Sequence, residues 1–323
     1  MKTWIDFDSA PVFCVPLIDP VGGVSVCAGM LIEGPQGWGE FSPPSGVSEE
    51  QAARWLTAAI EVGTVGWPDP LRGRVPVAVT VPSVSASRAA EIVAGAGCAT
   101  AVVRVGETSL EEDLARVSAV REALGFSGSV RVDANGAWDV DAAAAAVPEL
   151  DRAAGGLEFI EQPCRSLADV ALLRRRVEVR LAVDQSIWES AEPLALSLAD
   201  AVDVAVLNVG GLGGVRRALR VAETFDLPCV ASCDVQASIA IAGGLALAGV
   251  LPDAGYAHSL GGALLLSGDV VSEARHLAPA DGYLPVAPMP AGPDASRLEE
   301  FEASDTEMVA RWRGLLGAVQ RYL

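Results

Sequence analysis

Three carboxylates, Asp133, Glu161 and Asp184, each end a short apolar stretch of the sequence. Carboxylates buried together without a counter-charge repel one another, and each raises the pKa of the others. A divalent cation removes this repulsion, and an all-oxygen ligand set favours Mg2+ or Mn2+ over Zn2+. The pattern therefore predicts a metal site made by these three residues. Neutralisation of the cluster by nearby arginines is the alternative.

The carboxylates belong to a longer series of polar residues, which recur every 23 to 29 residues, about the length of one strand and one helix. In a parallel barrel the carboxyl ends of the strands open on one mouth, where active sites are built. We therefore expect the series to line one mouth, the alternative being that its members are unrelated strand-end caps. The series is Arg104, Asp133, Glu161, Asp184, Asn208, Ser232 and His258.

The basic residues limit the chemistry of this mouth, because Lys2 is the only lysine of the chain. Arginine keeps its proton at neutral pH, since its pKa stays above about 12. Arg104 is therefore expected to stabilise charge or to pair with a carboxylate, and not to act as a base. His258, Cys233 and Asp234 are other candidate proton acceptors, although a lone histidine is more often a hydrogen-bonded structural residue.

Short apolar strands and helical stretches alternate through the middle of the chain and must position these side chains. Eight strands joined by helical crossovers predict a parallel sheet that closes into a barrel. The expected strands are 75–82, 100–106, 129–135, 157–163, 179–185, 203–210, 228–234 and 255–262.

The two ends of the chain form a second unit in this prediction. Residues 1 to about 75 read as strands followed by a helix with Ser48 as its N-cap. The helical pattern of 306–323 is expected to pack back against this segment. The fold class is thus α/β, with an α+β capping domain of residues 1–75 and 283–323 and a barrel domain of residues 76–282.

Composition excludes several classes of partner. A formal net charge of -19 and a pI near 4.4 argue against nucleic acid and against anionic membranes. The uncharged stretch 235–252 is expected to be a buried helix, and no signal-peptide pattern is present at the N-terminus, so we expect a cytoplasmic protein. The six cysteines show no paired motif and are expected to be free thiols.

Several longer motifs resemble the enolase superfamily, and within it the short actinobacterial type of o-succinylbenzoate synthase. The resemblance implies an α+β capping domain over a modified TIM barrel of (β/α)7β type. It also implies Mg2+ (or Mn2+) on Asp133, Glu161 and Asp184, a small-molecule carboxylate substrate, and metal-dependent dehydration of a cyclohexadiene carboxylate in menaquinone biosynthesis. The motifs are GWGEFSP (37–43), VDANGAW (132–138), EFIEQPC (158–164), AVDQSI (182–187) and IAGGLALAGVLP (241–252).

The sequence departs from the family pattern where that family carries lysines. Val102 and Arg104 stand at its Lys-x-Lys pair, and Asn208 stands at the facing lysine of the sixth strand. Gln236 replaces an acidic residue of the seventh strand, and Asn208, Ser232, Gln236 and His258 are the expected substrate-binding residues. Three hypotheses remain: a synthase with rewired chemistry, a related enzyme acting on another carboxylate, or a non-catalytic protein that binds a metal or carboxylate ligand.

Overall fold

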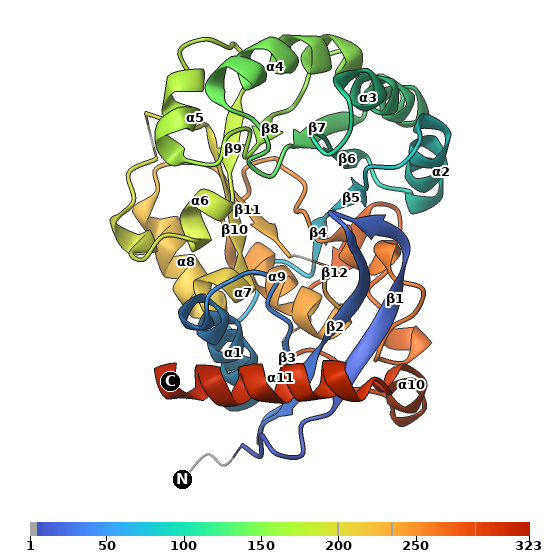
Figure 1. The fold of residues 1–323 in the computed structure, drawn as a ribbon, viewed down its shortest axis with the longest axis vertical. Coiled ribbons are helices and arrows are strands. Elements are labelled where there is room, and N and C mark those ends of the chain that lie inside the picture. Colours follow the sequence, from blue (N-terminus) through green and yellow to red (C-terminus); the bar gives the residue numbers. More distant parts are fainter. Residues whose placement is uncertain (1–4, 199, 234, 288) are drawn as a thin grey trace.

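A curled parallel sheet of seven strands forms the centre of the molecule (Figure 1). The computed structural model describes residues 5–323, except 199, 234 and 288. The strands follow the order of the chain from one edge of the sheet to the other, as the alternating sequence pattern predicts. They are β5 (Ala78–Val81), β6 (Thr100–Arg104), β7 (Ser129–Asp133), β8 (Ile160–Glu161), β9 (Leu181–Val183), β10 (Val204–Asn208) and β11 (Cys229–Ser232).

The two edges of this sheet are joined by a short segment that replaces the expected eighth strand. His258 makes a parallel bridge to Val77, just before β5, and Ser259 makes one to Ser232 of β11. The backbone N–H of Ala78 donates to the His258 carbonyl at 2.9 Å, and the N–H of Ser259 donates to the Ala231 carbonyl at 2.9 Å. The expected barrel is confirmed, with an eighth strand reduced to two bridges.

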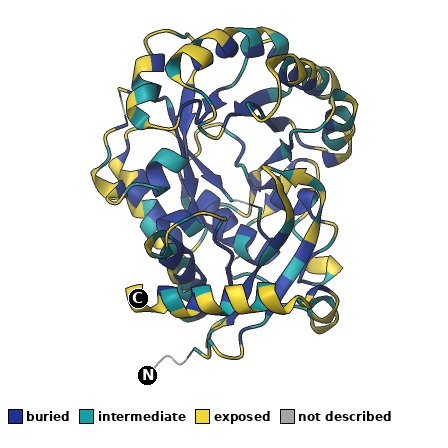
Figure 2. Cartoon of the chain, in the orientation of Figure 1, coloured by how far each residue is buried: buried dark blue, intermediate teal, exposed yellow. Residues whose placement is uncertain are grey.

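Helices cover the outside of the sheet and expose their polar faces (Figure 2). Their starts are set by local chemistry: Ser109, for example, forms a capping box with Glu112 at the start of the third helix. The helices that follow the strands are α2 (Ala86–Ala96), α3 (Leu110–Leu124), α4 (Val140–Ala154), α5 (Leu167–Leu173), α6 (Gln185–Trp188), α7 (Val209–Leu212) and α8 (Val215–Thr224), and the buried α9 (Ser238–Val250) comes after β11.

The uncharged stretch of the sequence forms α9, and this helix is buried along most of its length. Its position between the sheet and the N-terminal segment explains why it carries no polar face. No helix among the described residues is long and apolar enough to cross a membrane. The expectation of a buried helix in this region is confirmed.

The N-terminal segment forms a small antiparallel sheet and a helix, as the sequence predicts. Ser48 caps the helix by a capping box with Gln51. The turn of the first hairpin contains Gly22 and Gly23, which both have positive φ. The elements are β1 (Val12–Val21), β2 (Val24–Glu33), β3 (Trp38–Phe41), α1 (Glu49–Thr64) and β4 (Arg74–Pro76).

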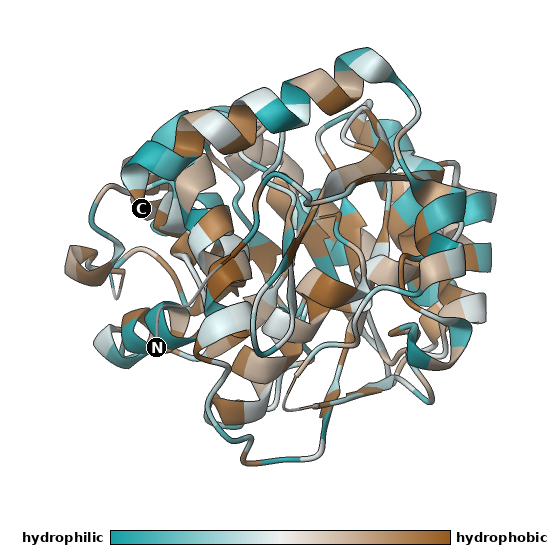
Figure 3. Ribbon diagram, turned by 90° about the horizontal axis from the view of Figure 1, so that it is seen from below, coloured by the Kyte–Doolittle hydropathy of each residue, from teal (hydrophilic) through white to brown (hydrophobic). Residues whose placement is uncertain are grey.

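The C-terminal segment packs back onto the N-terminal one, as expected. Strand β12 (Tyr283–Pro285) pairs antiparallel with β4, and Trp312 of the last helix meets Phe41 of β3 edge to face, with ring centroids 6.0 Å apart. Figure 3 shows hydrophilic and hydrophobic residues alternating along that helix. The remaining elements are α10 (Ala295–Phe301), α11 (Thr306–Val319) and short 3-10 turns at 193–195, 261–265, 273–275 and 320–322.

Candidate metal and carboxylate site at the barrel mouth

The register of the sheet brings the first members of the polar series together. Arg104 of β6 is the register partner of Asp133 of β7, which is in turn the partner of Glu161 of β8. Ala182 of β9 pairs with Glu161, and Asp184 follows directly after that strand. Four consecutive strands thus end in charged residues at one end of the barrel, as the spacing of these residues predicts.

Both oxygens of Asp133 are engaged. Oδ1 accepts a hydrogen bond from the backbone N–H of Asn135 at 2.8 Å, and Oδ2 accepts one from Nη1 of Arg104 at 2.5 Å. Arg104 also donates from Nε and Nη2 to Oε1 of Glu107, at 3.3 and 3.2 Å. One guanidinium therefore joins two carboxylates. Glu107 was not among the predicted site residues, because its contact depends on the loop that follows β6.

The two carboxylates fix the charge of Arg104. Burial lowers the pKa of its guanidinium, but the negative charges of Asp133 and Glu107 outweigh this effect, so the net pKa lies above its ordinary value. Only 13% of the Arg104 side chain is exposed. A guanidinium held in this way stays protonated at every accessible pH. It can donate hydrogen bonds and carries a positive charge, but it cannot accept a proton.

Glu161 is buried beside this pair and differs from Asp133 in its hydrogen bonding. Its Oε2 has no hydrogen-bond partner among the residues that the structure describes. Burial and the neighbouring Asp133 raise the pKa of the Glu161 carboxyl to about 8, while Arg131 and Arg104 act in the opposite direction. A buried oxygen without a donor is the kind of atom that a bound cation would satisfy.

The carboxylates fit a divalent cation in type and in strand position, but they do not form a preassembled cage. Among residues 5–323, leaving aside the three positions not described, no three Asp, Glu, His or Cys side chains lie close enough together to hold a metal ion. Asp133 is turned toward Arg104, and Asp184 begins α6 at its N-cap position. The oxygen ligands are thus those that a hard cation prefers, but one of them, Asp133, is bonded to Arg104.

A second arginine lies inside the barrel on the same strand as Asp133. Arg131 is fully buried; its Nε donates to Oε2 of Glu158 at 2.5 Å, and its Nη1 donates to the Ala257 carbonyl at 2.8 Å. The guanidinium also lies over the rings of Phe159 and Tyr256, at 4.4 and 5.7 Å from their centroids. Val102, which occupies a family lysine position, is the register partner of Arg131 on β6.

On the other side of the mouth, polar side chains bond to the backbone. Oδ1 of Asn208 accepts from the N–H of Gly211 at 2.9 Å and so caps α7. Ser232 is the register partner of Asn208, and its Oγ is buried without a hydrogen-bond partner in the described part of the chain. Both residues lie at strand ends as predicted, but the carbonyl oxygen of Asn208 is already used by the fold.

His258 is the residue of the series that is most clearly tied to the backbone. Its Nδ1 accepts a hydrogen bond from the N–H of Ala231 at 3.0 Å. Burial, together with the charges of Arg131 and Arg72, lowers the pKa of the imidazole to about 4. The ring is therefore neutral at pH 7, with its proton on Nε2. Of the other two candidate acceptors, Cys233 packs against Gly244, and Asp234 lies outside the described residues.

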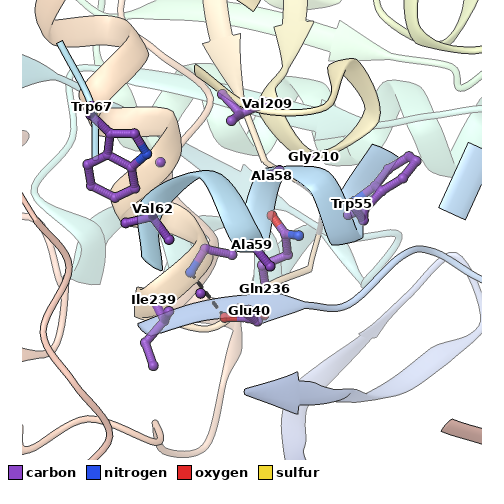
Figure 4. Close-up of a pocket in the computed structure, with 13 residues that line it drawn as sticks. Glu40, Trp55, Ala58, Ala59, Val62, Trp67, Val209, Gly210, Gln236 and Ile239 are labelled. Atoms are coloured by element: carbon purple, nitrogen blue, oxygen red, sulfur yellow. Dashed lines mark hydrogen bonds between the residues drawn. The ribbon is translucent and has the colours of Figure 1, made fainter. Parts of the chain in front are cut away.

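Gln236 lies at a cavity of about 30 Å3 between α1, β3, α7 and α9 (Figure 4). Its Nε2 and Oγ of Ser42 are 3.2 Å apart, and Ser42 donates to Oε1 of Glu40 at 2.8 Å. Glu40 also accepts from the backbone N–H groups of Ala237 and Ala240, at 3.2 and 3.1 Å. Burial is the main cause that raises the pKa of Glu40, to about 8. The cavity has room for about two water molecules.

The parallel barrel, the charged residues at its carboxyl mouth and the cap made from both chain ends fit the enolase superfamily, to which two family models assign the chain. Residues 85–293 match the family model described as enolase C-terminal domain-like, and residues 12–63 match the one described as enolase N-terminal domain-like. Within that superfamily, a curated o-succinylbenzoate synthase is 45% identical to the chain over 95% of its length, so the chain belongs to the family of o-succinylbenzoate synthases.

Curated relatives support this membership over nearly the whole chain. The sequence is 45% identical to o-succinylbenzoate synthase of Thermobifida fusca over 310 residues, 95% of each chain. It is 43% identical to the enzyme of that name from Mycolicibacterium smegmatis over 297 residues, 91% of this chain and 90% of the relative. The expected resemblance is therefore confirmed at the level of the family.

Solved structures agree on the fold. A muconate lactonizing enzyme from Pseudomonas fluorescens, crystallised with muconolactone, superposes with a TM-score of 0.78 at 22% identity, covering 94% of this chain and 100% of the other. The L-Ala-D/L-Glu epimerase of Bacillus subtilis gives a TM-score of 0.74 at 20% identity, with coverage of 91% and 98%. At these identities the likeness concerns the fold alone.

Proposed function

We propose that this protein binds a small-molecule carboxylate through a divalent cation at the barrel mouth, as an o-succinylbenzoate synthase-like member of its family. The observation that carries the proposal is the register of Arg104, Asp133 and Glu161 on adjacent strand ends, with Asp184 after the next strand. Parallel strands place such side chains at one point, where an anionic ligand needs positive charge.

Asp133, Glu161 and Asp184 are the proposed ligands of Mg2+ or Mn2+. A divalent cation held there would bind the substrate carboxylate and stabilise the negative charge that develops on removal of a proton. Arg104 supplies a further, permanent positive charge at the mouth, and in this structure it is bonded to Asp133. Asn208, Ser232, Gln236 and His258 remain the proposed contacts for the rest of the ligand.

The proposed chemistry departs from the family at the step of proton transfer. A lysine can act as a base because burial brings its pKa toward neutrality, whereas arginine cannot follow it. The barrel contains no lysine, since Lys2 is the only one in the chain. We therefore propose that dehydration of the cyclohexadiene carboxylate of menaquinone synthesis is at best slow here. The second candidate is binding or conversion of another carboxylate, because neither His258, whose Nδ1 accepts from the backbone, nor Asn208, which caps α7, replaces the missing lysine base.

Turnover of the synthase substrate tests this proposal directly. The protein is assayed with Mg2+ beside the double variant Arg104→Lys, Asn208→Lys. We expect kcat/KM of the unmodified chain to lie at least about a thousandfold below that of the double variant, because only the latter carries lysines at the positions where the family has them. Efficient turnover by the unmodified chain would contradict the proposed loss of the lysine-based route.

A further inference from the structure

Arg104 occupies the oxygen of Asp133 that faces away from Asn135, and it holds Glu107 at the same time. We propose that Arg104 competes with the divalent cation for Asp133, and that Glu107 is a positioning residue that retains Arg104 when the cation takes its place. The inference rests on the metal site proposed above and adds a residue, Glu107, that belongs to neither the ligand set nor the predicted contacts.

The competition follows from charge and from the number of acceptors. Asp133 has two oxygens, and the backbone N–H of Asn135 holds one of them at 2.8 Å. We expect the cation to bind at Oδ2, the oxygen that now accepts from Nη1 of Arg104. A metal ion beside this guanidinium would be repelled by it, because two positive charges lie close together in a site with little solvent. Metal binding thus includes the cost of separating Arg104 from Asp133.

Glu107 is placed to lower that cost. Its Oε1 already accepts from Nε and Nη2 of Arg104, so the guanidinium keeps one carboxylate partner after it leaves Asp133. The cap covers this contact: a side chain at Gly22, in the turn between β1 and β2, would begin 3.8 Å from Oε1 of Glu107. The same hairpin is fixed to α2 by a salt bridge of 2.9 Å between Asp19 and Arg88.

The alternative is that Arg104 is a permanent substitute for the metal and that no cation binds here. Oε2 of Glu161 argues against this alternative, since it is buried and accepts no hydrogen bond from Arg104 or from any other described residue. A complete replacement of the cation would satisfy both carboxylates. Instead, both oxygens of Asp133 accept hydrogen bonds, whereas Oε2 of Glu161 accepts none from the described residues. This arrangement is expected if Arg104 competes with a cation for Asp133 and does not replace it.

Calorimetric titration with Mg2+ alone, and separately with Mn2+ alone, tests the inference without substrate or turnover. Arg104→Gln is expected to tighten binding by about tenfold or more, the effect of removing one adjacent charge. Glu107→Gln is expected to weaken binding by about threefold. The double variant is expected to bind like Arg104→Gln alone, because Glu107 acts through Arg104 and has nothing to retain once the guanidinium is gone.

The matched control is Arg152→Gln, which removes the same charge from an exposed salt bridge with Glu149 on α4. It is expected to leave the metal affinity within about twofold of the parent, since exposed charges are screened. Equal tightening by Arg152→Gln and Arg104→Gln would overturn the inference in favour of net charge. So would a Glu107→Gln effect that persists in the Arg104→Gln background.

Two ligand variants separate failure of this inference from failure of the metal site itself. If Asp133→Asn and Glu161→Gln abolish binding while Arg104→Gln leaves it unchanged, the cation site stands and the competition is refuted. If neither ligand variant alters binding, the proposed site is wrong, and the inference falls with it. If the parent shows no binding and Arg104→Gln gains it, the competition is supported in its strongest form.

Discussion

Two arginines lie on neighbouring strands of the barrel, Arg131 fully buried and Arg104 partly exposed, and they are held by different kinds of partner. Arg131 is held by Glu158, by the Ala257 carbonyl and by two aromatic rings, and none of its surface is exposed. In the described part of the chain, the guanidinium of Arg104 bonds only to carboxylates, and it is partly exposed at the mouth. The contacts of Arg131 are those of a structural residue, whereas we propose that Asp133 can exchange the Arg104 guanidinium for a metal ion.

Replacement of Arg131 gives the largest expected effect. Arg131→Met leaves Glu158 and the Ala257 carbonyl without their donor, and breaking a buried pair in this way costs about 3–5 kcal/mol of unfolding free energy. Urea unfolding measures the loss. Arg88→Met, at a partly exposed salt bridge, is the control and is expected to cost less than about 1 kcal/mol. Equal losses in the two variants would refute a structural role for Arg131.

The pH dependence of stability tests the inner region further, through His258. The pKa of this imidazole is about 4 in the folded chain and near 6.5 when unfolded, so the unfolded state binds more protons between these values. Stability supplied by the neutral ring is therefore complete above pH 6.5 and is lost as the pH falls toward 4, by about 3 kcal/mol in all. Below pH 4 this contribution changes no further.

The measurement compares unfolding free energies of the parent and His258→Asn from pH 7.5 to pH 4. Asparagine keeps an acceptor near the N–H of Ala231 but does not titrate, so the two curves are expected to converge as the pH falls. Parallel curves would mean that His258 is not held as a neutral acceptor in the fold.

Much of this arrangement can be predicted from the sequence, because strand periodicity and caps are local signals. The spacing from Arg104 to Glu161 places three residues at strand ends, and the register confirms that they are neighbours. The caps of Ser48 and Ser109 follow from side chains within one helical turn. Because both signals are local, the sequence predicts the polar residues at the strand ends as well as the helices between those strands.

Several contacts that decide the chemistry were not predicted, for two reasons. Glu107 is only three residues from Arg104, but their contact depends on the conformation of the loop after β6, which strand periodicity does not give. Arg131 points into the barrel, but its partners come from 27 and 126 residues further along the chain. The eighth strand is also shorter than predicted. The backbone N–H of Ala231 donates to the side chain of His258, where a longer strand ladder would have a backbone acceptor.

The smallest expected loss of stability is that of Arg104→Gln, and it tests most directly whether Arg104 and Arg131 differ in role. Arg104→Gln is expected to lower the unfolding free energy by only about 1–2 kcal/mol in the absence of metal. Asp133 keeps its bond from the N–H of Asn135, and its side chain remains 10% exposed to solvent, which softens the loss of the guanidinium.

Added Mg2+ should then restore what Arg104→Gln removes, since a ligand that binds only the folded state raises its stability. Thermal unfolding with and without Mg2+ is expected to show a larger rise in Tm for Arg104→Gln than for the parent, and no rise for Arg131→Met beyond that of the parent. If Mg2+ raised the Tm of both arginine variants equally, the positive charges of Arg104 and Arg131 would be equally replaceable by a cation. Rescue at the mouth alone would establish that its positive charge is exchangeable while that of Arg131 is not.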